Sequence, residues 1–150
     1  MPESPDDKSF MEAALKQAAL AYELGEIPVG AVIVTNNKII ARGYNQTENL
    51  KDPTAHAEMI AITSACHFMG AKYLPNCTLY VTLEPCIMCF GAIKWAQLGR
   101  IVFGADDPKG GFSHFINKSS SYKMPDITKG ILEQECSGLL KTFFLQLRGK

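Results

Sequence analysis

The sequence predicts an α/β fold, a three-layer arrangement in which a mixed sheet lies between helices. Segments with helical periodicity alternate with β-rich runs along most of the 150 residues, and strands joined through helices usually belong to one sheet. Hydrophobic residues make up 47% of the chain and charged residues 20%, a composition that suits a globular protein. We expect a single domain over residues 1–150, in which residues 1–8 form a disordered tail.

A first helix is expected from Ser9 to Leu24. Ser9 and Glu12 have the spacing of a capping box, in which the serine caps the helix and the glutamate reaches back to it. The alanine-rich run that follows has helical spacing, and Gly25 stands where a helix-ending glycine belongs.

A β-hairpin is expected next, from two β-rich runs at residues 28–35 and 38–44. Only Asn36 and Asn37 separate the two runs. Because asparagine tolerates the positive φ angles of a type I′ turn, this pair favours a tight connection between antiparallel strands.

The middle of the chain alternates between helix and strand. Proline suits the first position of a helix, and glycine often follows its last turn, so these residues set the expected limits. The expected elements are a helix from residues 52–54 to Phe68, closed by Gly70, a strand over 77–83, a helix from Pro85 to Gln97, and a strand over 100–104.

The last part of the chain contains a long segment without periodicity and a final helix. Residues 105–125 show no regular pattern, and loops of this length are usually functional or disordered. The final helix carries its apolar residues on one stripe, formed by Leu132, Cys136, Leu139, Leu140, Phe143 and Leu147.

The cysteines and the N-terminus favour a cytoplasmic protein. Five irregularly spaced cysteines do not suit a disulfide framework, and reduced thiols are typical of the cytosol. The first ten residues are acidic and polar and lack the pattern of a signal peptide. Because no run of 18 apolar residues is present, we expect no membrane span.

The charges are balanced overall but divided unevenly along the chain. Fifteen basic and fifteen acidic residues give zero net charge, which argues against a broad surface for coating nucleic acid. Residues 1–60 carry five basic and nine acidic residues, whereas residues 61–150 carry ten and six. A polyanionic partner should therefore prefer a surface built from the second part.

Cys86 and Cys89 are the first candidates for a metal site. They are three residues apart in the first turn of a predicted helix, so their side chains share a face and the helix dipole favours their thiolates. Two other interpretations of the pair stay open from spacing alone, namely a redox pair and two core cysteines. A further ligand from elsewhere in the chain would favour the metal.

His56 is the candidate for that ligand, because it begins another helix whose N-terminus can reach the same edge of the sheet. His67 and His114 lie at the far end of that helix and in the long loop, and any one histidine alone would be interpreted as packed or solvent-facing. Three protein ligands leave the fourth position of a tetrahedral zinc open for water, as in catalytic sites. The sequence therefore predicts a catalytic zinc.

Glu58 is the candidate proton carrier, since it follows His56 by two residues. Zinc lowers the pKa of its water toward neutrality, and a nearby carboxylate can take that proton and pass it on. Residues two apart on a regular helix do not face the same way, however, so regular geometry does not bring both side chains to one metal. The alternative is a solvated surface carboxylate.

These motifs together resemble those of a known family. His-Ala-Glu at residues 56–58, followed by Pro-Cys-Ile-Met-Cys at 85–89, matches the signature of zinc-dependent nucleoside and nucleobase deaminases. Within that family, the chain is similar to the bacterial tRNA-specific adenosine deaminases from about residue 10 onward. The segments that carry the similarity are DPTAHAEM, TLYVTLEPCIMC, GRIVFGADDPKGG and ILEQECSGLLKTFF.

The resemblance implies a cytidine-deaminase-like fold with a central mixed five-stranded sheet. It implies hydrolytic deamination of the wobble adenosine of a tRNA anticodon to inosine, with Glu58 as the proton shuttle for zinc-activated water. The implied cofactor is one Zn²⁺ per chain, held by His56, Cys86 and Cys89. The implied partners are the anticodon loop of a tRNA of the tRNA-Arg type and a second copy of the chain in a homodimer.

The resemblance also implies residues that contact the substrate. Asn45 matches the asparagine that contacts the purine, and the backbone N–H groups of Ala57 and Cys86 would hold the attacking and departing groups. Further substrate contacts are expected from Pro28, Asp107, Lys109, Phe144 and Arg148. The loop FSHFINKSSSYKMPD departs from the family pattern, which leaves its RNA contacts open.

Two rival functions stay open. A deaminase for a free nucleobase or nucleoside, of the guanine or cytosine type, would use the same zinc and Glu58, and zero net charge suits a small uncharged substrate. A catalytically inactive, zinc-stabilised binding subunit is the other rival. Glu58 argues against it, because a structural zinc has no use for a proton shuttle.

Overall fold

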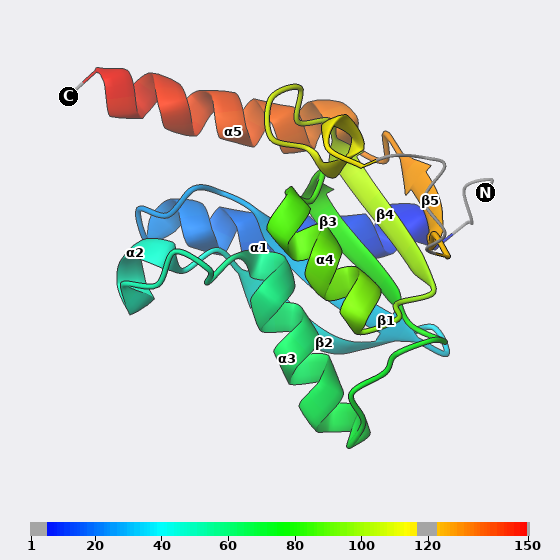
Figure 1. Cartoon of the computed structure of the whole chain (residues 1–150). Helices are drawn as coiled ribbons and strands as arrows, with labels where there is room; N and C mark the ends of the chain where they lie inside the picture. Colours follow the sequence, from blue (N-terminus) through cyan, green and yellow to red (C-terminus); the bar gives the residue numbers. More distant parts are fainter. Residues whose placement is uncertain (1–5, 117–122, 150) are drawn as a thin grey trace.

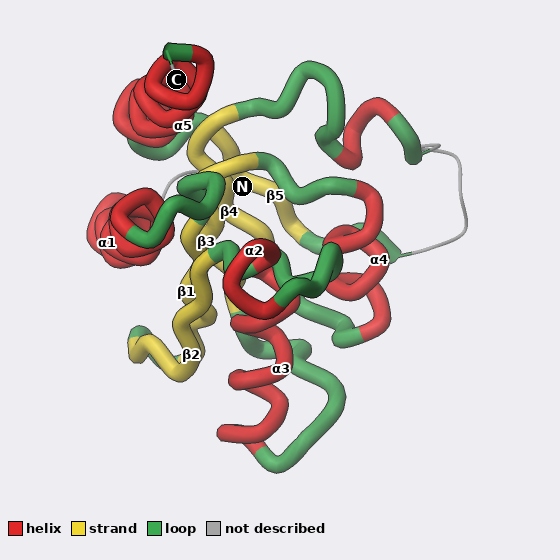
Figure 2. The backbone as a smooth tube through the Cα atoms, turned by 90° about the vertical axis from the view of Figure 1, so that its left-hand side faces the viewer, coloured by secondary structure: helices red, strands yellow, loops and turns green. Residues whose placement is uncertain are grey.

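The computed structural model describes residues 6–116 and 123–149. Its helices are α1 (Asp7–Glu23), α2 (Thr47–Leu50), α3 (Ala57–Met69), α4 (Ile87–Trp95), the 3₁₀ helix η1 (Phe112–His114) and α5 (Glu133–Arg148). α1 and α5 lie on one face of a central sheet, and α3 and α4 lie on the other, which gives the predicted three layers (Figures 1 and 2). None of the helices described has the length and apolar character that a membrane span requires.

The central sheet is mixed and five-stranded, as predicted, with the strand order β2-β1-β3-β4-β5. β1 pairs antiparallel with both β2 and β3, whereas β3 with β4 and β4 with β5 are parallel. The strands β2, β3 and β4 therefore all end at the same edge, where the chain continues toward α3, α4 and η1. The bounds are β1 (Gly30–Thr35), β2 (Lys38–Tyr44), β3 (Thr78–Leu83), β4 (Arg100–Ala105) and β5 (Asp126–Lys129).

The two faces of the sheet bury separate hydrophobic clusters. Successive side chains of a strand point to opposite faces, so Val32 packs with Met11 of α1, whereas Ile33 packs with the cluster under α3 and α4. Both side chains are fully buried. The central strands are therefore apolar on both faces, as expected for a sheet covered by helices on each side.

The tight connections follow their predicted chemistry. Asn36 and Asn37 have φ angles of 51° and 61°, and they join β1 to β2 as a hairpin. Gly25 and Gly70 have φ angles of 79° and 64° directly after α1 and α3. These left-handed conformations suit asparagine and glycine, and they confirm the predicted turn and the two predicted helix ends.

The start of the first helix was predicted wrongly. α1 begins at Asp7, its N-cap residue is Asp6, and Ser9 lies inside the helix without a capping role. Residues 1–8 were expected to be a disordered tail, but Asp7 and Lys8 belong to α1 and the Asp7 side chain is fully buried. Residues 1–5 lie outside the described part of the chain.

The second predicted helix begins later than expected. Residues 52–54 form a turn in which the Asp52 carboxylate accepts hydrogen bonds of 2.8 Å from both the N–H and the hydroxyl of Thr54. This side-chain-to-backbone bonding competes with helix formation. The short α2 precedes the turn, and α3 begins only at Ala57.

The segment from residue 105 to 125, predicted to lack regular structure, contains η1, and residues 117–122 lie outside the described residues. The strand β5 follows it and pairs with β4, although no strand was predicted there. In α5, the predicted apolar stripe is only partly covered. Cys136 is buried, whereas Leu147 is exposed, and Leu132 precedes the helix in a left-handed conformation.

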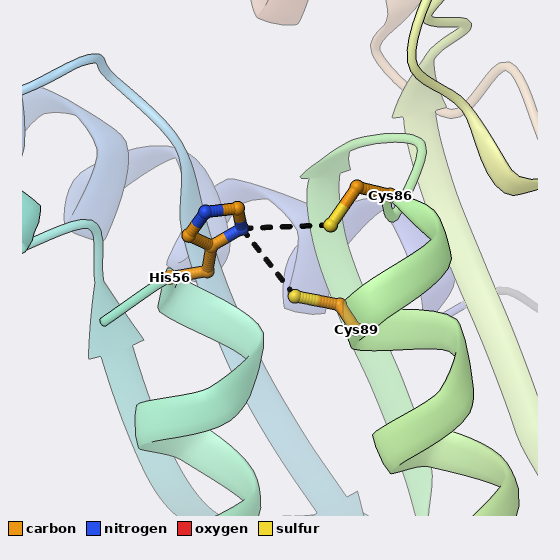
Figure 3. Close-up of side chains that lie close together, drawn as sticks. All are labelled: His56, Cys86 and Cys89. Carbon is orange, nitrogen blue, oxygen red and sulfur yellow. Dashed lines mark hydrogen bonds between the residues drawn. The ribbon is translucent and has the colours of Figure 1, made fainter. Parts of the chain in front are cut away.

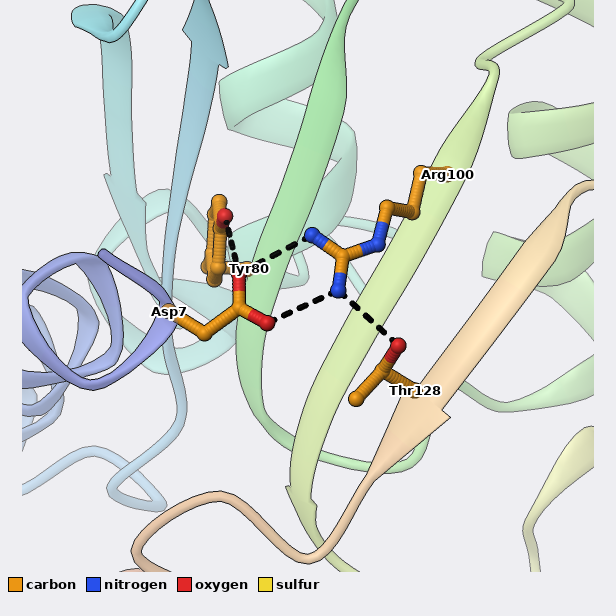
Figure 4. Close-up of polar contacts among 4 residues, drawn as sticks. All are labelled: Asp7, Tyr80, Arg100 and Thr128. Carbon is orange, nitrogen blue, oxygen red and sulfur yellow. Dashed lines mark hydrogen bonds and ion pairs between the residues drawn. The ribbon is translucent and has the colours of Figure 1, made fainter. Parts of the chain in front are cut away.

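A buried ion pair joins α1 to the sheet. The Asp7 carboxylate accepts hydrogen bonds from both terminal nitrogens of Arg100 at 2.9 and 2.8 Å, and a third at 2.7 Å from the Tyr80 hydroxyl (Figure 4). Arg100 also donates to the Thr128 hydroxyl on β5 at 2.9 Å. Burial and the neighbouring carboxylate raise the pKa of Tyr80, and the ion pair raises that of Arg100. One group of charges thus ties α1, β3, β4 and β5 together.

Replacing Asp7 with alanine is expected to lower the free energy of unfolding by about 3 kcal/mol, because the guanidinium of Arg100 then stays largely buried without its partner. Chemical denaturation of the purified variant measures this change. The neighbouring Asp6→Ala is the matched control, since Asp6 is exposed and caps nothing with its side chain. Equal destabilisation by the two substitutions would contradict a structural role for the ion pair.

Candidate active site

Three metal-donor side chains converge at the edge of the sheet where β2 and β3 end. The Nδ1 atom of His56 lies 3.7 Å from the Sγ atom of Cys86 and 3.5 Å from that of Cys89 (Figure 3). All three donor atoms lie within 4.8 Å of one another. Tetrahedral zinc with ordinary Zn–N and Zn–S bonds places nitrogen and sulfur about 3.5 Å apart. The donor set therefore fits zinc in both chemistry and spacing, as predicted.

The ends of two helices bring these donors together. His56 is the N-cap residue of α3 and Cys86 is the N-cap residue of α4, both with extended backbones. α4 thus begins after Cys86 and not at Pro85 as expected. An N-cap side chain folds back over the first turn of its helix, so Cys86 faces Cys89 and both face the start of α3.

The same geometry removes the difficulty over His56 and Glu58. The rule that residues two apart face different ways applies within a helix, but His56 precedes α3 and has an extended backbone with a ψ angle of 155°. Glu58 is the second residue of the helix and points inward. Both side chains can therefore reach one metal site.

Cys86 and Cys89 shift each other's pKa values in opposite directions. The hydrogen bond from Cys89 lowers the pKa of Cys86 to about 4, and His56 acts in the same direction. The hydrogen bond to Cys86 and burial raise the pKa of Cys89. The lowered pKa favours the thiolate form of Cys86, which is the form that binds a divalent cation.

Glu58 is a buried carboxyl group beside these sulfurs. Its side chain is 4% exposed, so the alternative of a solvated surface carboxylate is wrong. Burial raises the pKa of Glu58 to about 7, and the positive charge of His56 acts in the opposite direction. A carboxyl group whose pKa is close to neutrality is suited to accept and donate a proton in one reaction cycle.

The predicted purine contact, Asn45, lies at the border of this site but already has partners. Its side-chain amide donates to the carbonyl of Ile27 and its oxygen accepts from the N–H of Thr47, both at 3.3 Å. The neighbouring Gln46 N–H donates to the carbonyl of Ala55, so this segment lies against the residues that lead into α3. Two further predicted residues, Pro28 and Ala57, are buried.

The predicted RNA contacts lie in two other places. The Asp107 carboxylate accepts hydrogen bonds from the N–H groups of Lys109 and Gly110, at 3.1 and 3.0 Å, and so closes the turn that follows β4. Lys109 itself is exposed. Phe144 and Arg148 are exposed near the C-terminal end of α5. Among the described residues, neither forms a hydrogen bond with the three metal donors.

Two buried carboxylates near the site were not predicted from the sequence. Glu84 and Glu26 accept backbone hydrogen bonds from residues that are 22 or more positions away in the sequence. A charged residue between a buried strand and Pro85 was a usable signal for Glu84. Glu26 gives no comparable signal, because a glutamate after a helix-ending glycine is usually solvated.

Comparison with known proteins identifies the family. Residues 4–105 match the model of the cytidine and deoxycytidylate deaminase zinc-binding region. The chain belongs to this deaminase family. The curated tRNA-specific adenosine deaminase of Bacillus subtilis is 45% identical over 148 residues, which cover 96% of this chain and 92% of the relative. That of Aquifex aeolicus is 45% identical over 142 residues, covering 93% of this chain and 94% of the relative.

Solved structures agree with the assignment to the deaminase family. A structure from a study of A-to-I editing by tRNA:A34 deaminases at the wobble position of transfer RNA is 44% identical, with a TM-score of 0.83, and covers 88% of this chain and 99% of its own. The guanine deaminase of Bacillus subtilis is 33% identical, with a TM-score of 0.65, covering 95% and 94%. The predicted resemblance and the cytidine-deaminase-like fold are therefore confirmed.

Proposed function

We propose that this chain deaminates the wobble adenosine of a tRNA anticodon, with water as co-substrate and inosine and ammonia as products. The observation that carries the reaction type is the buried Glu58 beside three converging metal donors. The relatives that are 44–45% identical over nearly the whole chain support the substrate. We further propose a tRNA of the tRNA-Arg type as substrate and the cytoplasm as location, which suits five free cysteines.

In this proposal His56, Cys86 and Cys89 hold zinc and leave the fourth tetrahedral position open. Bound zinc supplies the Lewis acidity that makes water a nucleophile at neutral pH. Glu58 accepts a proton from the attacking water and delivers it to N1 of the adenine. It then accepts the proton of the new hydroxyl group on C6 and delivers it to the amino group, which leaves as ammonia. The N–H groups of Ala57 and Cys86, at the starts of two helices, stabilise the attacking and departing groups.

The rival with a specific observation in its favour is the deamination of free guanine, because the guanine deaminase structure matches 95% of the chain. Its identity of 33% is lower than the 44% of the tRNA:A34 deaminase structure, and its TM-score is lower as well. An inactive zinc-stabilised subunit has no comparable support. In an inactive subunit, the burial of Glu58, which raises its pKa, would cost stability and bring no catalytic benefit.

We propose that Lys109, Phe144 and Arg148 contact the RNA and that Asn45 contacts the purine. Arg148→Ala is expected to weaken binding of an anticodon stem-loop and to reduce the slope of log affinity against log salt by about one, because one phosphate contact is lost. Fluorescence anisotropy across a salt series measures both quantities. Lys38→Ala is the matched control, since Lys38 lies exposed at the hairpin end of the sheet, away from the site. Unchanged affinity and slope in Arg148→Ala would contradict this contact.

We propose that the protein is a homodimer that uses the exposed ends of α3 and α4. Trp95 is 83% exposed at the end of α4 and Phe68 is 66% exposed near the end of α3. Large aromatic side chains this exposed on neighbouring helices are typical of interfaces. Analytical ultracentrifugation should give twice the chain mass of 16.5 kDa, and Trp95→Asp should give the monomer mass. Leu24→Asp, at the end of α1, is the control, and a monomeric wild-type protein would contradict the proposal.

A further inference from the structure

Two buried carboxylates beside the active site have no part in the proposed reaction. The side chains of Glu84 and Glu26 are 3% and 1% exposed. Within the part of the chain that the structure describes, neither forms an ion pair with a lysine or arginine. A buried carboxylate without a cation is unfavourable unless hydrogen bonds satisfy its oxygens, so each of the two needs a structural explanation.

Glu84 is satisfied by the loop that follows β4, residues 106–113. Its two carboxylate oxygens accept one hydrogen bond each, from the N–H groups of Asp107 and Ser113, both at 3.1 Å. The loop packs directly on the carboxylate at Gly111, where an added Cβ atom would lie 2.3 Å from the carboxyl carbon. Glu84 therefore fixes both ends of this loop at once.

The 106–113 loop is in turn bonded to the segment that carries Cys86. The N–H of Phe112 donates to the carbonyl of Pro85 at 2.9 Å, and Gly111 forms an isolated β-bridge with Cys86. The Phe112 ring stacks on Phe90, with the ring centroids 4.3 Å apart. The 106–113 loop, which carries the exposed Lys109, therefore packs against the start of α4 and against Glu84.

Glu26 makes the same arrangement on the other flank of the site, with the segment of residues 45–56, called here the 45–56 loop, which includes the short helix α2. Its oxygens accept hydrogen bonds from the N–H groups of Glu48 at 3.0 Å and Asn49 at 2.7 Å. This loop contains Asn45 and ends at His56, and the bond from Gln46 to Ala55 closes it at 3.0 Å. Each buried carboxylate therefore holds a loop that leads to, or is bonded beside, a metal-donor residue.

We propose that Glu84 and Glu26 are positioning residues that hold these two loops in the shape that receives the substrate. The inference deepens the proposed function and rests on it. A carboxylate is required because each oxygen faces an N–H donor, whereas glutamine offers one acceptor and turns its own N–H groups toward the other donor. Since neither carboxylate touches the reacting atoms, its loss should act on substrate binding more than on turnover.

The test uses the zinc-loaded full chain with the substitutions Glu84→Gln and Glu26→Gln. Glu84→Gln should raise KM for an anticodon stem-loop roughly tenfold, the size of one lost charge-assisted hydrogen bond, and change kcat less than about threefold. Amide hydrogen exchange should accelerate in residues 106–113 for Glu84→Gln and in residues 45–56 for Glu26→Gln, each without affecting the other loop. The exposed Glu12→Gln is the matched control and should change neither quantity.

Exchange in both loops at the wild-type rate, or an unchanged KM, would overturn the inference. Loss of zinc from Glu84→Gln would also overturn it, because the residue would then support the metal ligands and not the loop. Should Glu84→Gln fail to fold, Glu84→Asp keeps both oxygens on a shorter side chain and should show the same loop-specific exchange in weaker form. If wild-type protein does not deaminate RNA, the proposed function fails, and the exchange rates alone decide whether the carboxylates hold the loops.

Discussion

Replacing Glu58 with alanine is expected to lower kcat by about 10²–10⁴-fold, the range of general acid–base catalysis, while the fold and the zinc content persist. The side chain is buried beside the sulfurs, and its carboxyl pKa is raised to about 7, so it can both accept and donate the transferred protons. The pKa of Glu58 is shifted by all three metal donors, His56, Cys86 and Cys89, so its carboxyl group lies beside them. Loss of Glu58 therefore removes the proton carrier from the site.

Single-turnover kinetics and elemental analysis of the same preparation measure this prediction. Glu58→Gln is the matched variant, because it keeps the volume and polarity of the side chain but cannot carry the proton. It should be as inactive as Glu58→Ala and at least as stable. A variant that loses its metal would show that Glu58 is a ligand, and the proposed mechanism would be wrong.

Replacing Cys86 with alanine is expected to abolish tight zinc binding and, with it, detectable deamination. Among the residues that the structure describes, three protein donors converge at the site, so removal of one leaves two, too few for a stable tetrahedral site. Because metal binding is linked to folding, the melting temperature of Cys86→Ala should no longer respond to added zinc, whereas that of wild-type protein should fall with a chelator.

Cys66→Ala is the matched control for this experiment. Cys66 is a free, half-buried cysteine on α3 that lies outside the donor group. It should bind one zinc per chain with wild-type affinity. Full zinc content in Cys86→Ala would contradict the ligand assignment, and zinc-free wild-type protein prepared without chelators would contradict the cofactor itself.

The parts of the fold that local chemistry decides could be predicted from the sequence. The positive φ angles of Asn36 and Asn37 and the glycine-terminated helices follow from the conformational range of those residues. The metal donors were also predictable, because a Cys-x-x-Cys pair and a histidine at two helix starts have few other uses in combination. Functional residues that are grouped in short sequence motifs can therefore be identified without knowledge of the fold.

Features that depend on distant partners could not be predicted. Asp7 begins α1 and is buried because it pairs with Arg100, which lies 93 residues away in the sequence. No residue near Asp7 in the sequence indicates that partner. The strand β5 is only four residues long, and its pairing with β4 stabilises it. The β propensity of so short a segment does not predict that pairing. Glu26 accepts a hydrogen bond from a backbone N–H more than 20 residues further along the chain. Each of these features depends on contacts between residues far apart in the sequence.

The proximity of His56 and Glu58 could be predicted only in part from the sequence. Both residues were identified from the sequence, but a regular helix from residues 52–54 would have pointed them apart. The Asp52–Thr54 turn delays the helix until Ala57, so that His56 becomes its N-cap and gains an extended backbone. A start point displaced by a few residues, which sequence patterns resolve poorly, therefore decided the geometry of the site.

The most direct test of the proposed function is deamination of RNA and of free bases in parallel. Zinc-loaded wild-type protein is incubated with an anticodon stem-loop that carries adenosine at the wobble position and, separately, with guanine, cytosine and adenosine, and ammonia and inosine are quantified. We expect inosine at the wobble position with equimolar ammonia, and no ammonia from the free compounds. Ammonia from a free base together with an unchanged stem-loop would contradict the tRNA assignment and would make this chain a free-base deaminase.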